Sequence, residues 1–175
     1  MRILKFGGTS MGDAQTWKRV IEIIKTYDTP FIVVSATART TRSLIKAAHK
    51  AIDHPQEAQI IADDIATRHN NIVEHFLADY DDSTQSLKAC HNWIDIHIEE
   101  LKEHLDTIHN QQELTEQLKD VIASIGERLS SYLFTECGYA AGLYTTWLDA
   151  TQIIRTDSNF GKASPNSEYI SDKIN

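Results

Sequence analysis

The sequence of 175 residues predicts an α/β layered fold, and three features of its first third indicate it. Two short apolar stretches occur there, and each is followed by a turn and then by apolar residues at helical spacing. The second stretch, FIVVSA (residues 31–36), is continuously apolar, as strands buried on both faces of a parallel sheet are. Alternation of strand and helix is typical of helices packed on such a sheet.

The first block of the chain supplies this alternation. RILKF (residues 2–6) is the first expected strand, and FIVVSA is the second. Between them, apolar residues at helical spacing predict a helix, with Asp13 as a plausible N-cap. After the second strand and a further turn, another apolar stripe predicts a second helix. The two stripes comprise Ala14, Trp17, Val20, Ile21 and Ile24, and then Leu44, Ile45, Ala48 and Ile52.

Residues 55–112 form a second block that reads as almost entirely helical. One apolar stripe runs as far as Phe76, and DYDDS (residues 79–83) then interrupts it, with Asp82 or Ser83 able to cap the next helix. Leu87, Ile94, Leu101 and Ile108 recur every seven residues after the break. Two long antiparallel helices are the simplest structure for this pattern.

The third block begins near residue 114 with a long helical pattern that ends near Gly138 or at Gly142. YTTWLDA (residues 144–150) and QIIRT (residues 152–156) then read as short strands, and residues 157–170 are rich in turn formers. The last five residues look like the start of another helix. We therefore expect the chain to be part of a longer protein.

Composition limits the classes of function. The chain carries 17 Lys and Arg against 25 Asp and Glu, a net charge of −8, without a basic block. This balance argues against nucleic acid and against an anionic membrane surface as partners. No apolar run reaches the ~18 residues of a spanning helix, so we expect a cytoplasmic protein. Cys90 and Cys137 are predicted to be buried free thiols. The eight histidines show no HExxH or i, i+4 pattern, so we predict no metal site.

KFGGTS (residues 5–10) is the first motif that bears on function. A strand that ends in Lys5 runs into Gly7 and Gly8, then into two hydroxyl residues before a helix. Glycine lets backbone N–H groups approach phosphate oxygens, and the helix N-terminus and Lys5 add positive charge. A phosphate site and a merely tight turn both fit this motif. The spacing of a Walker A loop is absent.

Two further motifs carry candidate ligand groups. SATARTTR (residues 35–42) follows the second strand, where α/β sheets bind ligands, and its hydroxyls and two arginines would suit a carboxylate-bearing substrate. A solvated loop is the alternative. In SIGERLSS (residues 124–131), Gly126 interrupts a helical pattern, which lets a backbone or a ligand come near and places Glu127 in the same space. An exposed glutamate beside a packing glycine is the alternative there.

In this order, KFGGTSMG, VVSA, GERLSS and RTDSNFGKASP together resemble the N-terminal part of the aspartate kinases, in the amino acid kinase superfamily, across essentially the whole chain. The resemblance implies a three-layer α/β/α sandwich of the carbamate kinase-like type, of which residues 1–175 are the N-terminal, amino-acid-binding lobe with a long helical hairpin. It also implies that the nucleotide lobe and the ACT regulatory domains lie outside this chain, which alone is expected to be inactive.

The implied reaction is ATP-dependent phosphorylation of L-aspartate to 4-phospho-L-aspartate, the entry to lysine, threonine and methionine synthesis, with Mg²⁺ carried by ATP. The parent enzyme is expected to be a homo-oligomer. The resemblance makes Lys5 the catalytic residue that stabilises the transferred phosphoryl group, and it places the nucleotide against the first motif. Ser35, Thr41 and Glu127 are the implied substrate contacts. The residues expected at the phosphates are Lys5, Phe6, Gly7, Gly8, Thr9 and Ser10.

Other functions stay open on the sequence. Glutamate 5-kinase and acetylglutamate kinase share the lysine and the glycine-rich first turn. A helical interaction module, built on the seven-residue repeat of residues 55–112, is a candidate from a different class. The chain also departs from the family in having Arg42 where Asn is common and Ile125 where His is common.

Overall fold

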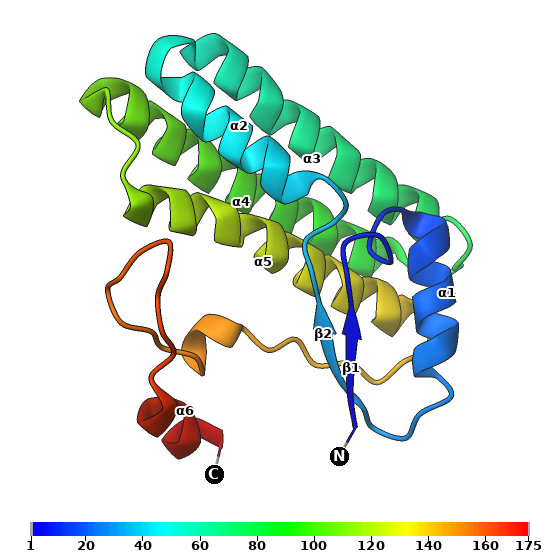
Figure 1. Ribbon diagram of the computed structural model, residues 1–175. Coiled ribbons are helices and arrows are strands. Elements are labelled where there is room, and N and C mark those ends of the chain that lie inside the picture. The colour runs from blue at the N-terminus through cyan, green and yellow to red at the C-terminus, as the bar shows by residue number, and fades with distance from the viewer. Residues whose placement is uncertain (1, 175) are drawn as a thin grey trace.

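The computed structural model describes residues 2–174, which form two β-strands, six α-helices and one 3-10 helix. Figure 1 shows the two strands near the centre of the molecule, with long helices gathered at one end of them and the last segment of the chain beside them. In chain order the elements are β1 (Ile3–Phe6), α1 (Ala14–Ile24), β2 (Phe31–Val34), α2 (Thr40–Asp53), α3 (Pro55–Leu77), α4 (Thr84–Gln111), α5 (Glu116–Ala140), the 3-10 helix η1 (Ala150–Gln152) and α6 (Ser167–Ile174).

The two strands pair in parallel, as the alternation of strand and helix predicts. Ile3 lies opposite Phe31 and Phe6 lies opposite Val34, and α1 makes the crossover between the strands. The amide of Ser35 donates to the Phe6 carbonyl oxygen at 3.0 Å, so pairing continues just beyond β2. The turns that follow β1 and β2 therefore lie side by side at one edge of the sheet (Figure 1).

The prediction that β2 is buried on both faces is wrong for the described residues. Side chains alternate between a face packed on the core and a face open to solvent. On the open face Ile3, Phe31 and Val33 are 62%, 45% and 40% exposed. Leu4, Phe6, Ile32 and Val34 pack against the core on the other face. The physical reason is that residues 2–174 supply helices to only one face of the sheet.

Helix α1 forms as its sequence predicts. The Asp13 side chain accepts from the Thr16 amide at 2.8 Å, and the Thr16 hydroxyl oxygen accepts from the Asp13 amide at 3.0 Å, which makes a reciprocal cap. Every residue of the predicted apolar stripe, from Ala14 to Ile24, is buried. Trp17 reaches the Phe134 ring of α5 at a centroid distance of 5.5 Å, so α1 is packed against the helices that form the core.

Helices α2, α3, α4 and α5 pack around one another as a four-helix cluster (Figure 1). The predicted hairpin of residues 55–112 is present as α3 and α4, and α4 begins after Ser83. The apolar positions at seven-residue spacing face inwards, so the seam packs within this molecule. Cys90 and Cys137 are free and buried as predicted, and burial raises the pKa of the Cys137 thiol.

The predicted strands at residues 144–150 and 152–156 do not form. Exposure alternates along residues 143–150, as it does in a strand, but this segment lies against α5, and no strand among residues 2–174 pairs with it. Side chains hold it there instead, because the Trp147 indole N–H donates to the Ser131 hydroxyl at 3.0 Å and the ring meets Trp93 edge-on at 5.0 Å. The expected final helix is present as α6.

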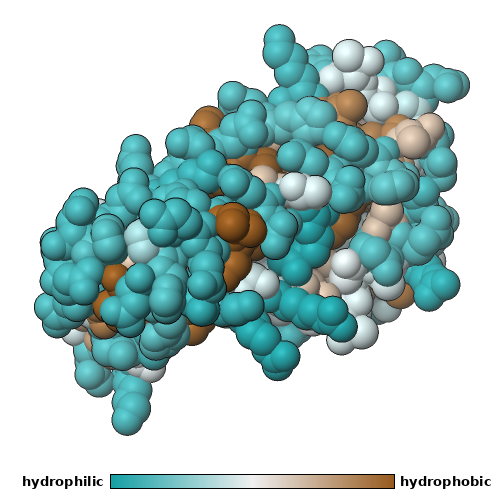
Figure 2. All heavy atoms as spheres, turned by 90° about the horizontal axis from the view of Figure 1, so that it is seen from above, coloured by the Kyte–Doolittle hydropathy of each residue, from teal (hydrophilic) through white to brown (hydrophobic). Residues whose placement is uncertain are grey.

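The outer faces of the helices are polar. Seen from above, the molecule presents mainly hydrophilic side chains, between which hydrophobic ones are scattered (Figure 2). Among the described residues, every helix is too short or too polar to cross a membrane.

Candidate functional site

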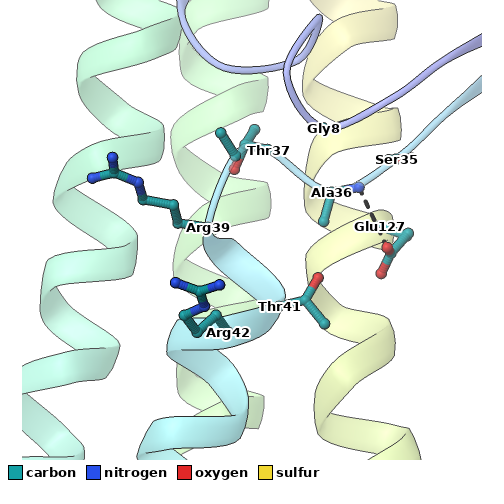
Figure 3. A pocket seen from close by; sticks show the side chains of 9 residues that line it. Gly8, Ser35, Ala36, Thr37, Arg39, Thr41, Arg42 and Glu127 are labelled. Carbon is teal, nitrogen blue, oxygen red and sulfur yellow. Dashed lines mark hydrogen bonds between the residues drawn. The ribbon is translucent and has the colours of Figure 1, made fainter.

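A pocket of about 530 Å³ opens where the turns after the two strands meet helix α5. The first turn contributes Gly8 and α5 contributes Glu127, while the second turn and the first turn of α2 supply the rest of the wall (Figure 3). The full lining is Gly8, Ser35, Ala36, Thr37, Ala38, Arg39, Thr41, Arg42 and Glu127. Three segments that are far apart in the sequence therefore meet in one concave site, at the carboxyl ends of parallel strands.

The first turn presents backbone amides that are free to bind a ligand. The Met11 amide donates to the Gly7 carbonyl oxygen at 3.1 Å, and the Gly12 amide donates to the Thr9 carbonyl oxygen at 3.3 Å. Among residues 2–174, no acceptor is bonded to the amide N–H groups of Gly8, Thr9 or Ser10. Successive unused N–H groups before a helix are suited to binding an anion.

Lys5 and Phe6 lie on opposite faces of β1. Lys5 is exposed, and its Nζ lies 3.5 Å from the position that a Cβ on Gly7 would occupy. The ammonium group therefore sits beside the first turn and adds a full positive charge there. The Phe6 side chain packs against the core, so only its backbone is on the side of the pocket. Phe6, Thr9 and Ser10 are not among the residues that line the pocket.

Helix α5 holds the second turn from one side. The amide of Ala36 donates to Glu127 Oε1 at 3.4 Å, and the Ser130 hydroxyl donates to the Ser35 carbonyl oxygen at 2.9 Å (Figure 3 shows the first of these). Gly126 permits this approach, because a Cβ there would lie 3.0 Å from the Ala36 Cβ. Glu127 is itself exposed, so its carboxylate remains open to a ligand. Gly126 therefore packs against the second turn, and Glu127 lines the pocket.

Helix α3 holds the second turn from the other side, through residues that the sequence analysis did not single out. The Thr37 hydroxyl is 2.9 Å from His69 Nε2, and Arg68 donates to the Thr40 hydroxyl at 2.9 Å. His69 is fully buried, and this burial lowers its pKa from 6.5 to about 4, so the ring is neutral at pH 7. A histidine in the middle of the apolar stripe of residues 58–76 was the available sequence signal.

Positive charge gathers at the mouth of the pocket. Arg39 and Arg42 line it, are exposed, and have no ion-pair partner among the described residues. Arg68 lies close enough to Arg39 that the two cations repel, and burial together with this repulsion lowers the Arg68 pKa. Figure 3 shows the Arg39 and Arg42 side chains on one side of the α2 N-terminus and Glu127 on the other. The site thus offers opposite charges at its two ends.

Comparison with known proteins places the chain in a family. The sequence profile of the amino acid kinase family matches residues 1–175. The chain belongs to the amino acid kinase family. This chain is also similar to the aspartokinase of Chlamydia muridarum (strain MoPn / Nigg), with 34% identity over 163 residues that cover 93% of this chain and 33% of that protein. Aspartokinase 1, chloroplastic, of Arabidopsis thaliana is 30% identical over 159 residues, or 89% of this chain and 26% of that protein.

A solved structure shares the fold of this amino acid kinase chain. The crystal structure of E. coli aspartokinase III in complex with aspartate and ADP superimposes with a TM-score of 0.86 at 24% identity, over 99% of this chain and 36% of that chain. The agreement confirms the predicted α/β fold and its N-terminal lobe. The chain spans a quarter to a third of the length of the two curated relatives.

The structure brings some predicted site residues together and leaves others apart. Gly8, which the resemblance assigns to the phosphates, lines the same pocket as Ser35, Thr41 and Glu127, which it assigns to the substrate. The residues from Lys5 to Gly7 stand beside it, at the end of β1 and in the first turn.

Proposed function

We propose that this chain is the amino-acid-binding lobe of an aspartate kinase, which transfers the γ-phosphoryl group of Mg-ATP to the side-chain carboxylate of L-aspartate. The observation that carries the proposal is the pocket in which Gly8, Ser35, Thr41 and Glu127 converge. The named relatives that match nearly the whole chain are aspartokinases, which supports the choice of substrate. The proposed enzyme acts in the cytoplasm, as a homo-oligomer, at the entry to lysine, threonine and methionine synthesis.

The charges of the pocket suit a small zwitterion with an extra carboxylate. Glu127 is exposed on the pocket wall and accepts one long hydrogen bond from the residues that the structure describes, so its carboxylate can bind the substrate ammonium group. The hydroxyl groups of Ser35 and Thr41 stand on the second turn and on the first turn of α2, where they can donate to a carboxylate. Arg39 and Arg42 add positive charge on the side away from Glu127.

The first turn suits the terminal phosphates of the nucleotide. The free amides of Gly8, Thr9 and Ser10 can donate to phosphate oxygens, and Lys5 supplies a full positive charge beside Gly7. Gly7 and Gly8 carry no side chain that would hold a phosphate away from the backbone. Mg²⁺, carried on the nucleotide oxygens, supplies further neutralisation of negative charge when it is bound.

The chemistry needs positioning and charge neutralisation more than covalent help from the protein. An oxygen of the aspartate side chain attacks the γ-phosphorus, and the bond from that phosphorus to the bridging oxygen of ADP breaks. The electron pair of the broken bond leaves with ADP. The attacking carboxylate is already ionised at neutral pH, so no general base is required. Lys5 stands where charge develops on the transferred group.

Calorimetric titration of the chain with L-aspartate, L-glutamate and Mg-ATP tests the proposal. We expect L-aspartate to bind at least ~10-fold more tightly than L-glutamate, because one extra methylene group must be accommodated in a pocket of fixed size. Mg-ATP is expected to bind weakly or not at all, since this lobe holds only the phosphate-facing turn. Tighter binding of L-glutamate would overturn the assignment of the substrate.

Glu127→Gln separates the negative charge of Glu127 from its hydrogen bond to the Ala36 amide. Glutamine keeps an oxygen that accepts from the Ala36 amide but loses the negative charge, so we expect aspartate affinity to fall at least ~10-fold with the fold intact. Glu103→Gln is the matched control, because Glu103 is exposed on α4, away from the pocket. Equal loss in both variants would show that net charge, and not the position of Glu127, determines binding.

A further inference from the structure

A buried chain of hydroxyl groups joins the wall of the pocket to helix α3. Thr37 lines the pocket and is 2% exposed, and Thr40 behind it is fully buried. The two hydroxyl groups are hydrogen-bonded to each other. Thr37 also meets His69 Nε2 at 2.9 Å, and Thr40 accepts from Arg68 at 2.9 Å. The turn that forms the pocket is thus tied to α3 through side chains.

The donors and acceptors in this row of hydrogen bonds can be assigned in one direction only. His69 Nδ1 lies 2.7 Å from the carbonyl oxygen of Ile65, which can only accept, so Nδ1 carries the proton of the neutral ring. Nε2 is then an acceptor, and the Thr37 hydroxyl must donate to it. Thr37 therefore accepts from the Thr40 hydroxyl. Thr40 in turn accepts from the guanidinium of Arg68, and bonds aligned in this way strengthen one another.

The side-chain bonds of Thr37 and Thr40 to His69 and Arg68, which we call the tether, hold a strained piece of backbone. Arg39 follows Thr37 closely and has a φ of 70°, in the left-handed region that residues other than glycine adopt only when their surroundings hold them there. Its own side chain makes no cap hydrogen bond to α2. The Thr40 amide closes the turn by donating to the Thr37 carbonyl oxygen at 3.0 Å. Arg39 therefore stands between two threonines that are both fixed through α3.

We propose that His69 is a positioning residue, which holds residues 35–39 through Thr37 in the conformation that forms the wall of the pocket. Helix α5 fixes Ser35 and Ala36 from one side, and His69 and Arg68 fix Thr37 and Thr40 from the other. His69 does not line the pocket, so its effect reaches a ligand through the turn. Its role in substrate affinity rests on the proposed function, whereas its hold on the turn does not.

His69→Leu and His69→Gln test this role. Leucine leaves the Thr37 hydroxyl without an acceptor, whereas the carbonyl oxygen of glutamine reaches the Nε2 position and can accept from it. His75→Leu is the matched control, because His75 is on the same helix and bonds the Asn71 carbonyl oxygen in the same way, but is exposed and does not line the pocket. Thr37→Val and Thr37→Ser form a second pair that removes or keeps the donor should the leucine variant fail to fold.

Two readouts separate the tether from the substrate assignment. Amide hydrogen exchange of residues 35–41 in this chain should quicken about 10- to 100-fold in His69→Leu and Thr37→Val, and stay within about threefold in His69→Gln, Thr37→Ser and His75→Leu. In the natural gene product, KM for L-aspartate should rise at least ~10-fold in His69→Leu and Thr37→Val, with kcat changed less than about twofold.

The two readouts can fail independently. Unchanged exchange in His69→Leu and Thr37→Val, or an equal increase in His69→Gln, would overturn the positioning role, because packing alone would then explain the residue. A large exchange effect together with wild-type protein that does not use L-aspartate would support the tether and reject the proposed function. A fall in kcat with KM unchanged would also contradict a role confined to positioning.

Discussion

Gly7 and Gly8 are residues whose identity the fold itself does not explain. Neither has a positive φ, since among the glycines of the described chain only Gly142 and Gly161 do. A Cβ on Gly8 would meet the Ala36 carbonyl oxygen at 3.4 Å, an ordinary van der Waals contact. Neither backbone strain nor protein packing therefore demands glycine in this turn. Close approach of a ligand to the backbone is the remaining physical reason for a pair of glycines here.

Gly8→Ala is the change that tests this reason. We expect the free energy of unfolding to change by less than about 1 kcal/mol, because the new methyl group fits and alanine has less conformational freedom in the unfolded chain. Turnover of the natural gene product should fall at least ~10-fold, because the methyl group stands where a phosphate would lie against the amides. Thermal unfolding and an ADP-release assay give the two values. Normal turnover would show that phosphates do not approach Gly8.

Single residues of the site were predictable only where they belong to a motif. Gly8, Ser35 and Glu127 were found because they stand at strand ends or beside a glycine, where the sequence pattern changes. His69 and Arg68 were not found, because a histidine within an apolar stripe indicates a buried polar group but not which turn that group contacts. Their importance comes from tertiary contact across about thirty residues of sequence, as in the Thr37–His69 pair.

At the scale of elements, local signals were sufficient for helices and insufficient for strands. Helix α1 has its cap and its apolar stripe within its own sequence, and α3 and α4 follow from periodicity in the same way. A strand also needs a partner. Residues 143–150 keep the alternating exposure of a strand, but they contact helix α5 through side chains, so the periodicity was right and the inferred pairing was wrong.

Gly126 tests how closely α5 must approach the second turn. A Cβ at this position would lie 3.0 Å from the Ala36 Cβ, and Leu44 and Thr40 atoms lie 3.3 and 3.4 Å away. In Gly126→Ala the overpacking costs roughly 1–3 kcal/mol, which outweighs the gain of about 1 kcal/mol in helix propensity. We expect a lower melting temperature and weaker aspartate binding, measured by thermal unfolding and by titration.

Gly138→Ala is the matched control on the same helix. Its added methyl group would meet the Thr145 Cγ2 at 3.2 Å, in the irregular segment after α5, which can move more readily than the packed second turn. We expect a smaller loss of stability and unchanged aspartate binding in this variant. Should both variants bind aspartate as the wild type does, the spacing between α5 and the second turn would not control the pocket.

At the scale of the whole molecule, the layered arrangement followed from the order of strands and helices. Which parts of the sheet the helices cover did not. The alternation in residues 3–53 predicted a parallel pair with a helical crossover, which the structure has. That α2 to α5 would gather as one cluster could not be deduced from their separate stripes, because a stripe shows which side of a helix is buried and not what it packs against. The exposed side chains of Ile3, Phe31 and Val33 are the result.

Burial of histidine in this cluster links the stability of the molecule to pH. The pKa of His69 is about 4 in the folded protein against 6.5 for an unperturbed histidine, because burial and the Arg68 cation oppose its charge more than the Ile65 hydrogen bond favours it. Burial also lowers the pKa of His97. Between the two pKa values of His69, the unfolded chain binds more protons than the folded protein. The free energy of unfolding therefore falls as the pH drops from about 6.5 towards 4.

The expected loss from His69 alone approaches about 3 kcal/mol at pH 4, since each unit of pKa difference corresponds to about 1.4 kcal/mol. Chemical denaturation between pH 7.5 and 4.5 measures the slope. His69→Gln removes this titrating group while keeping an acceptor for Thr37, so its slope should be clearly shallower than that of the wild type. Identical slopes in the wild type and His69→Gln would contradict the lowered pKa of His69 in the folded protein.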